Sequence, residues 1–315
     1  MRLHCLQRAS NDLPPGDLTR LYLQLPAIGG RDICKLAPQF RYMTAPARRR
    51  AAAQPQLEKQ PNLGAHLYYK TPDALAAQKT LYIMFSGQNG GFFVPLSVFV
   101  SLLPDGPKDV LAIRSTLENF FLDGVEGFGG NAYDVANALR EKMRTEDYNK
   151  VVVLGFSAGS IFALRVAEFL AADIAISLAC VYPDEGFRIK KTVAAGITGF
   201  DPICACRPTQ VGRLINVVAT KCEFDVLCSQ RLKNIRPALM AIHLVNNPKH
   251  NVLKPMLKAG YARVFMRVAL GRNGMMIRFI SGLSSAYGLW VVRPVRRLFG
   301  MQKVADWYTA HKKGS

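Results

Sequence analysis

The stretch KVVVLGFSAGSIFALRVAEFLA, residues 150–171, decides the fold. Its first five residues, 150–154, are almost purely apolar, which predicts a strand that is buried on both faces. Residues 160–171 carry apolar side chains at helical spacing, so they predict a helix directly after the strand. Residues 155–159 (GFSAG) must then form a tight turn from the strand into the helix.

This turn has the pattern G-x-S-x-G in the strand–turn–helix context that gives the pattern chemical meaning. Gly155 and Gly159 are expected because a side chain at either position would strike neighbouring backbone. Ser157 would then present its hydroxyl at the N-terminus of a helix, where the helix dipole and free N–H groups favour developing negative charge. We interpret Ser157 as a nucleophile.

With these residues the chain resembles the α/β-hydrolases, the superfamily of serine esterases, lipases, thioesterases and related acyltransferases. The resemblance covers about residues 78–270. It implies a mostly parallel sheet flanked by helices, and a nucleophile, an acid and a histidine in that order along the chain. It implies no metal and no organic cofactor.

A family member keeps its histidine after the last strand. His250 lies in the loop beyond the apolar run 239–245 and before a helical pattern, so it is the expected catalytic base. His243 lies inside that run and is interpreted as a buried strand residue. The other histidines are interpreted as surface residues: His4, His66 and His311.

The acid should follow the preceding strand, which we predict at residues 214–219. Asp225 matches the usual acid position, where it would fix the tautomer of His250 and stabilise its imidazolium form. Glu223 is the alternative within the same loop. Asp184 competes from the end of the strand predicted at 174–182, because some family members place the acid there.

An oxyanion hole completes the machinery that the resemblance implies. One donor would be the backbone N–H of Ala158, directly after the nucleophile. The other would come from the loop 86–91 (SGQNGG), where by position it would be the N–H of Gln88. Family members often have His-Gly at the start of this loop, whereas this chain has Ser86-Gly87.

Apolar runs and amphipathic helices alternate along the rest of the core and predict a parallel sheet with helices on both faces. We predict further strands at 80–85, 109–113 and 239–245, and helices at 131–144 and 253–270. Residues 1–77 form an N-terminal segment that could supply leading strands of the same sheet, and residues 78–270 form the hydrolase core.

Residues 183–213 are too few for a large helical lid, so we expect a small or absent lid and an open site for a small or polymeric acyl substrate. The expected activity is hydrolysis of an ester or a thioester. An acyltransferase acting on a sugar, lipid or polymeric acceptor is the first alternative. A non-catalytic binding protein of the same fold is the second.

The 315-residue chain has 41 Lys and Arg against 22 Asp and Glu, a net charge of +19. Twelve of these bases and only one acid lie from Lys254 onward. Residues 271–315 form a basic amphipathic segment, which is typical of helices that bind an anionic membrane surface or an acidic polymer. It is equally typical of a helix packed on the core. Nucleic acid is not expected, because no signature for it is present.

The seven cysteines show neither the density of a disulfide scaffold nor the paired spacing of a zinc site. They predict mostly reduced thiols in a reducing compartment. The N-terminus lacks the apolar region of a signal peptide. The sequence therefore predicts a cytoplasmic protein, with peripheral attachment at the inner membrane surface as the alternative.

Overall fold

The computed structural model describes a central part of the chain in several pieces: residues 57–115, 120–182, 211–235, 240–245, 247–259 and 262–271. Residues 183–210 and 272–315 lie outside this part, and with them most of the expected lid region, Asp184 and the basic C-terminal segment. The attachment of that segment to an anionic surface therefore stays a prediction.

Eight strands form one sheet in the order β1-β2-β4-β3-β5-β6-β7-β8. The six strands from β4 to β8 in this order are parallel, and β1 and β2 extend the β4 edge in antiparallel fashion. The strands are β1 (Glu58–Lys59), β2 (Leu67–Lys70), β3 (Thr80–Phe85), β4 (Lys108–Ile113), β5 (Lys150–Phe156), β6 (Ile174–Leu178), β7 (Arg213–Ala219) and β8 (Met240–Val245).

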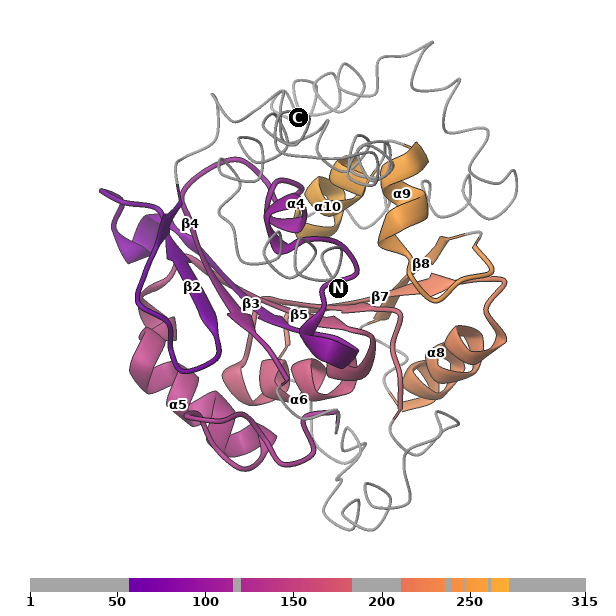
Figure 1. Ribbon diagram of the computed structural model, residues 1–315, viewed down its shortest axis with the longest axis horizontal. Helices are drawn as coiled ribbons and strands as arrows, with labels where there is room; N and C mark the ends of the chain where they lie inside the picture. The colour runs from indigo at the N-terminus through magenta and orange to yellow at the C-terminus, as the bar shows by residue number, and fades with distance from the viewer. Residues whose placement is uncertain are drawn as a thin grey trace, which may run out of the picture.

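Helices cover both faces of the sheet (Figure 1). On one face lie α5 (Ala132–Met143), α6 (Ser160–Leu170) and α8 (Glu223–Ile235). On the other lie α4 (Leu96–Val100), α9 (Leu253–Ala259) and α10 (Ala262–Leu270). This three-layer arrangement confirms the predicted fold class, a mostly parallel α/β sheet of the α/β-hydrolase type.

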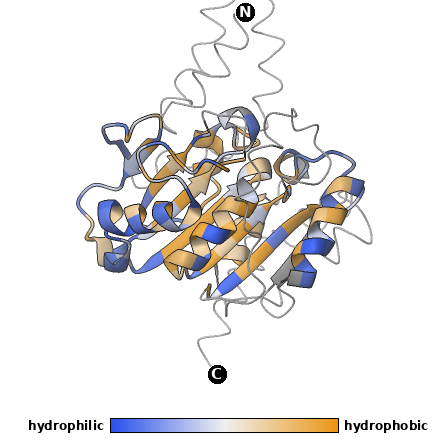
Figure 2. Ribbon diagram, turned by 90° about the horizontal axis from the view of Figure 1, so that it is seen from below, coloured by the Kyte–Doolittle hydropathy of each residue, from blue (hydrophilic) through white to orange (hydrophobic). Residues whose placement is uncertain are grey.

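The core lies on both sides of the sheet because successive strand residues point to opposite faces. Along β3, Leu81, Ile83 and Phe85 pack against the α5–α6 side, whereas Tyr82 and Met84 face the α4–α10 side. All five side chains are buried. In Figure 2 the strands are mostly apolar, whereas the helices combine apolar and hydrophilic residues. The continuous apolar runs of the sequence follow from this double burial.

Three sequence expectations are wrong in detail. The strand predicted at 174–182 ends at Leu178, because Ala179 takes a left-handed conformation (φ 54°) and leads the chain out of the sheet while it stays buried. The predicted helix 253–270 is described as two helices, α9 and α10. His66 is buried and not at the surface: its Nε2 donates to the carbonyl of Glu126, and burial lowers its pKa.

Within the described part of the chain, no helix combines the length and the apolar character that crossing a membrane requires.

Candidate active site

The turn after β5 holds Ser157 in a strained conformation. The strand ends at Phe156, a 3₁₀ turn follows (η4, Ser157–Gly159), and α6 begins at Ser160. Ser157 has a φ of 50°, in the left-handed region that residues with a Cβ rarely adopt. Such strain persists only where the surroundings enforce it, and it is concentrated at functional sites.

The two glycines of the turn are required by close packing, as the sequence predicted. A Cβ on Gly155 would lie 2.4 Å from the Cα of Ser160. A Cβ on Gly159 would lie 2.3 Å from the carbonyl oxygen of Ser86 and 3.0 Å from the ring of Phe121. Any side chain would therefore push α6 or the neighbouring strand away from the turn.

The predicted acid lies at the start of a helix and not in a loop. After β7 the chain enters α8, which begins at Glu223 and carries Asp225 in its first turn. Asp225 is 1% exposed, whereas the side chain of Glu223 is exposed. Of the two candidates that are described, only Asp225 contacts His250. A sequence pattern could not separate them, because only the direction of the helix decides which carboxylate points inward.

His250 joins the nucleophile to the acid. It lies in the loop between β8 and α9, where its Nδ1 is 2.5 Å from Asp225 Oδ1 and its Nε2 is 2.6 Å from Ser157 Oγ. The imidazole side chain is 25% exposed. His243 lies inside β8, as predicted. The structure thus brings together the three residues that the sequence selected, although they are separated by up to 93 positions.

The predicted oxyanion loop lies beside the turn that carries Ser157. Ser86 is fully buried, and its hydroxyl accepts from the N–H of Ser115 at 3.0 Å. A Cβ on Gly87 would lie 3.2 Å from the Cβ of Ser157. Gln88 begins a 3₁₀ turn (η2, Gln88–Gly90), and Ala158 lies in the first turn after β5. Backbone N–H groups at the start of a helical turn lack partners within that turn, which is the property that the predicted role of Gln88 and Ala158 requires.

Two residues that the sequence analysis missed hold His250 in place. Asn251 donates from Nδ2 to the carbonyl of Phe93 at 2.9 Å and accepts at Oδ1 from the N–H of Lys254 at 3.1 Å. Phe93 has a φ of 63°, and its ring meets that of His250 edge to face at 5.5 Å. The asparagine next to His250 was a visible signal, but its partner is 158 positions away.

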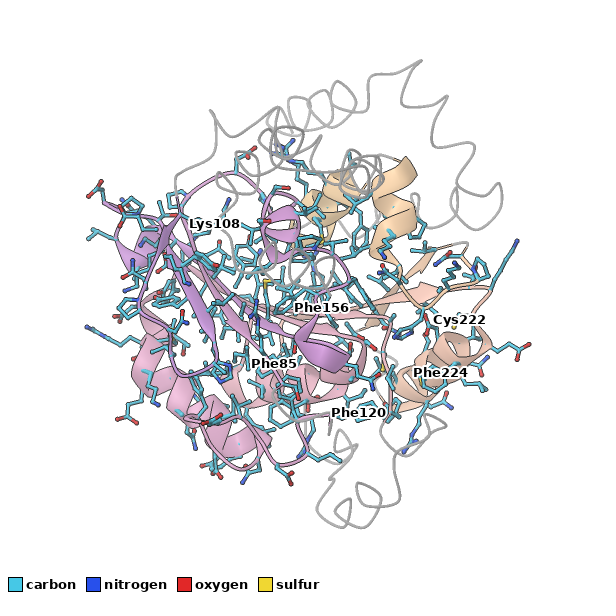
Figure 3. All side chains as sticks on the ribbon, viewed as in Figure 1. Phe85, Lys108, Phe120, Phe156, Cys222 and Phe224 are labelled. Atoms are coloured by element: carbon cyan, nitrogen blue, oxygen red, sulfur yellow. The ribbon has the colours of Figure 1, made fainter. Side chains whose placement is uncertain are left out.

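A third missed residue is Cys222, which precedes α8 (Figure 3). Its Sγ lies within 4.8 Å of a ring nitrogen of His250 and of a carboxylate oxygen of Asp225. Burial raises the pKa of this thiol, and the charge of Asp225 acts in the same direction, against the backbone N–H groups of Phe224 and Asp225. Phe224 also approaches the His250 ring, with centroids 6.4 Å apart.

Comparisons with protein-family models and with curated proteins find no match for this sequence. Among solved structures, the chain is similar to enterochelin esterase from Shigella flexneri, with a TM-score of 0.42 and 13% identity over 74% of this chain. It spans 59% of the length of that esterase.

Two other similar structures are matched over nearly their whole length. Esterase B from Lactobacillus rhamnosis has a TM-score of 0.44 and 14% identity over 80% of this chain and 95% of its own. Dienelactone hydrolase from Anabaena variabilis has a TM-score of 0.42 and 13% identity over 67% of this chain and 95% of its own. Because these identities and TM-scores are low, the fold of this protein rests on its own strand order and its candidate site on the distances given above.

Proposed function

We propose that this protein is a serine hydrolase that cleaves a carboxylic ester or a thioester through an acyl-enzyme on Ser157. One observation carries the proposal: Ser157 Oγ lies 2.6 Å from His250 Nε2, and His250 Nδ1 lies 2.5 Å from Asp225 Oδ1. This line joins a hydroxyl, an imidazole and a buried carboxylate, the three groups that activate a serine for acyl transfer.

Acylation begins when Ser157 Oγ attacks the carbonyl carbon of the substrate and His250 Nε2 takes the hydroxyl proton. Asp225 accepts a hydrogen bond from Nδ1–H, which keeps Nε2 free to act as the base. Once the imidazole is protonated, the carboxylate stabilises its positive charge. The imidazolium then gives its proton to the leaving alcohol or thiol, and the acyl group stays on Ser157.

Negative charge develops on the carbonyl oxygen during the attack, and we assign the N–H groups of Ala158 and Gln88 as the donors that would receive it. The closeness of the loop 86–91 to the nucleophile supports this role, since a Cβ on Gly87 would lie 3.2 Å from the Cβ of Ser157. Losing one such donor costs about 10²–10³ in kcat in enzymes where it has been measured.

Deacylation repeats these steps with water, which His250 deprotonates as it attacks the acyl carbon. An acceptor hydroxyl in the same position would make the protein an acyltransferase, since the first half of the reaction is common to both. Product analysis separates the two: free acid indicates hydrolysis, and an acylated sugar, lipid or polymer indicates transfer.

The test is labelling with a fluorophosphonate probe, followed by mass spectrometry of the labelled peptide. We expect the label on Ser157 and its loss in Ser157→Ala and His250→Ala. Ser160→Ala is the matched control, because Ser160 lies three residues away with a fully buried side chain and should leave labelling intact. Equal labelling of the Ser157→Ala variant would refute Ser157 as the nucleophile, and no label on folded protein would refute the proposal and favour a binding protein.

A further inference from the structure

Three side chains with zinc-binding chemistry meet beside the candidate active site. Cys222 Sγ, a carboxylate oxygen of Asp225 and a ring nitrogen of His250 all lie within 4.8 Å of one another. Cys222 and Asp225 come from the start of α8, and His250 comes from the loop after β8. Thiolate, imidazole and carboxylate are the ligands that Zn²⁺ takes in proteins.

An unused oxygen of Asp225 points to a cation at this place. Oδ1 contacts His250, but Oδ2 is buried and has no hydrogen-bond partner among the described residues, in a side chain that is 1% exposed. A buried carboxylate oxygen without a partner is costly, so a ligand for it would be favoured. The thiol of Cys222 lies beside this carboxylate and hydrogen-bonds to it, and a bound cation would take the place of the thiol proton.

The charges of the cluster also suit a divalent ion. A Cys222 thiolate and the Asp225 carboxylate together carry two negative charges, and the imidazole is a neutral ligand. Burial and the Asp225 carboxylate raise the pKa of the Cys222 thiol, against the backbone N–H groups of Phe224 and Asp225, and a bound divalent cation would offset both of the opposing effects. His250 and Cys222 are partly exposed, so an ion can enter from solvent.

We propose that Cys222, Asp225 and His250 form an inhibitory site for a zinc-like, thiophilic divalent cation, bound through Sγ, Oδ2 and Nδ1. Zinc–ligand distances are about 2.0–2.3 Å, so side-chain rotations that move the three ligand atoms by about 1 Å bring them onto one ion, and water fills the fourth position. The binding itself is independent of the proposed hydrolysis, whereas the inhibition rests on it.

The inhibition follows from the fate of two protons. Cys222 loses its thiol proton to solvent when the ion binds. The proton on His250 Nδ1 has to leave that nitrogen, and a neutral imidazole then carries it on Nε2. Nε2–H cannot accept the proton of Ser157, so the base is lost while the ion stays. A chelator reverses both changes.

Binding is measured first, without any substrate. The full chain is freed of metal with a chelator, dialysed and titrated with Co²⁺, whose thiolate complexes absorb in the near ultraviolet. We expect this band in the wild type and in Cys228→Ala, a control with its sulfur elsewhere on α8, and its absence in Cys222→Ser. Serine is a poor ligand but can still cap the helix.

Inhibition is then measured with Zn²⁺ on ester hydrolysis, each variant relative to its own metal-free rate. We expect wild type and Cys228→Ala to lose at least about tenfold in rate, reversibly with chelator, and Cys222→Ser to need at least about tenfold more Zn²⁺. A missing Co²⁺ band, or equal sensitivity of Cys222→Ser, would overturn the proposal. A Co²⁺ band in a protein that hydrolyses nothing would keep the metal site and refute the hydrolase.

Discussion

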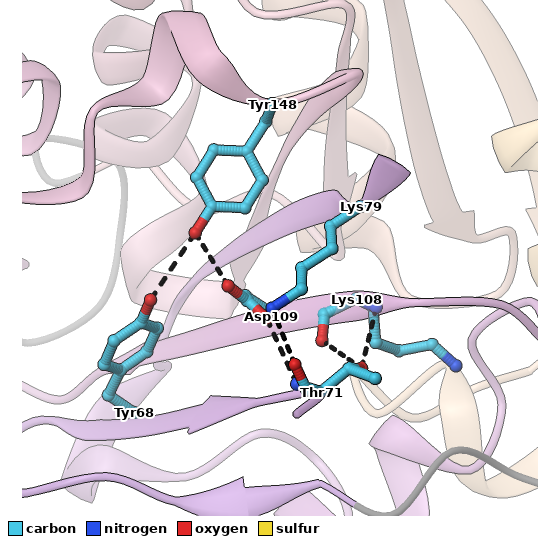
Figure 4. A network of polar contacts seen from close by, with 6 residues as sticks. All are labelled: Tyr68, Thr71, Lys79, Lys108, Asp109 and Tyr148. Atoms are coloured by element: carbon cyan, nitrogen blue, oxygen red, sulfur yellow. Dashed lines mark hydrogen bonds and ion pairs between the residues drawn. The ribbon is translucent and has the colours of Figure 1, made fainter. Parts of the chain in front are cut away.

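Asp109 and Asp225 are both buried aspartates, 2% and 1% exposed, but their surroundings differ in kind. Both oxygens of Asp109 are occupied: Lys79 Nζ lies 3.1 Å away, the N–H of Thr71 donates at 3.2 Å, and the hydroxyl of Tyr148 donates at 2.7 Å (Figure 4). Asp225 Oδ1 contacts His250, the Cys222 thiol lies beside the same carboxylate, and Oδ2 has no hydrogen-bond partner among the described residues.

The hydroxyl groups around Asp109 are also protonated and hydrogen-bonded. Burial raises the pKa of Tyr148, and it raises that of Tyr68 to about 12, so both hydroxyls keep their protons at neutral pH. Thr71 also bonds to the backbone of Lys108 in both directions and so fixes the chain after β2 against β4. A network that leaves no group unsatisfied stabilises one structure and offers nothing to a ligand.

The two aspartates also lie at opposite ends of the parallel strands, Asp109 at the amino end and Asp225 at the carboxyl end. Asp109 is the second residue of β4, whereas Asp225 follows the carboxyl end of β7. Ligands of open parallel sheets bind beyond the carboxyl ends of the strands. The comparison teaches that burial alone does not mark a functional carboxylate, whereas a partly exposed histidine shared with a nucleophile does.

The largest effect is expected from Asp225→Asn. The amide NH₂ can donate to Nδ1, which a carboxylate cannot do, so His250 is held in the wrong tautomer, and we expect kcat to fall by about 10⁴ with the fold intact. Steady-state kinetics and a circular dichroism spectrum measure both. Asp184→Asn is the control for the other acid candidate, and an inactive Asp184→Asn beside an active Asp225→Asn would overturn the assignment.

The counterpart in the closed network is Asp109→Asn, which should spare the chemistry and weaken the fold. Lys79 would keep a buried charge without its counterion, and breaking such a pair costs about 3–5 kcal/mol of unfolding free energy. Urea unfolding measures this loss. Adding Lys79→Met should recover part of the stability, because the unpaired charge is then gone. Wild-type stability in Asp109→Asn would erase the distinction between the two regions.

A smaller effect on catalysis is expected from Asn251→Asp. The change removes the donor to the Phe93 carbonyl but keeps the acceptor for the N–H of Lys254, so α9 should remain capped. Loss of one hydrogen bond that positions His250 should lower kcat about tenfold and leave KM nearly unchanged. The test compares kcat and KM of wild type, Asn251→Asp and Asn251→Ala, the last of which loses both hydrogen bonds. An unchanged kcat would assign Asn251 to helix capping alone.

The smallest effect concerns the strain at Ser157. The free energy of unfolding of Ser157→Gly should be about 0.5–1 kcal/mol larger than that of Ser157→Ala, because glycine tolerates a φ of 50°. Both variants lack the nucleophile, so urea unfolding compares strain alone. At Ser160, which has a helical φ of −65°, the order of glycine and alanine should reverse. The same order at both positions would mean that the turn is not strained.

Local patterns made much of this fold readable in advance. The strands β3, β4, β5 and β7 lie within two residues of their predicted bounds, since a strand buried on both faces must be a continuous apolar run. The helix α5 was as clear, because apolar residues recur at helical spacing along residues 131–144, and the structure adds that Asn131 caps it and Arg144 ends it in a left-handed conformation. The helix α8 was not predicted, although Phe224, Cys228 and Leu232 recur at helical spacing and pack into the core, because residues 223–225 were assigned to an acid loop.

By itself, the sequence determined the parallel sheet, the G-x-S-x-G turn and the serine, acid and histidine in their order. These features depend on neighbouring residues, whose side chains decide periodicity and turn geometry. Only the tertiary structure decided that Asp225 and not Glu223 meets His250, that Asn251 binds Phe93 across the site, and that Cys222 faces the same carboxylate. Such contacts depend on how distant strands and helices are oriented in the folded chain, which local residue patterns do not encode.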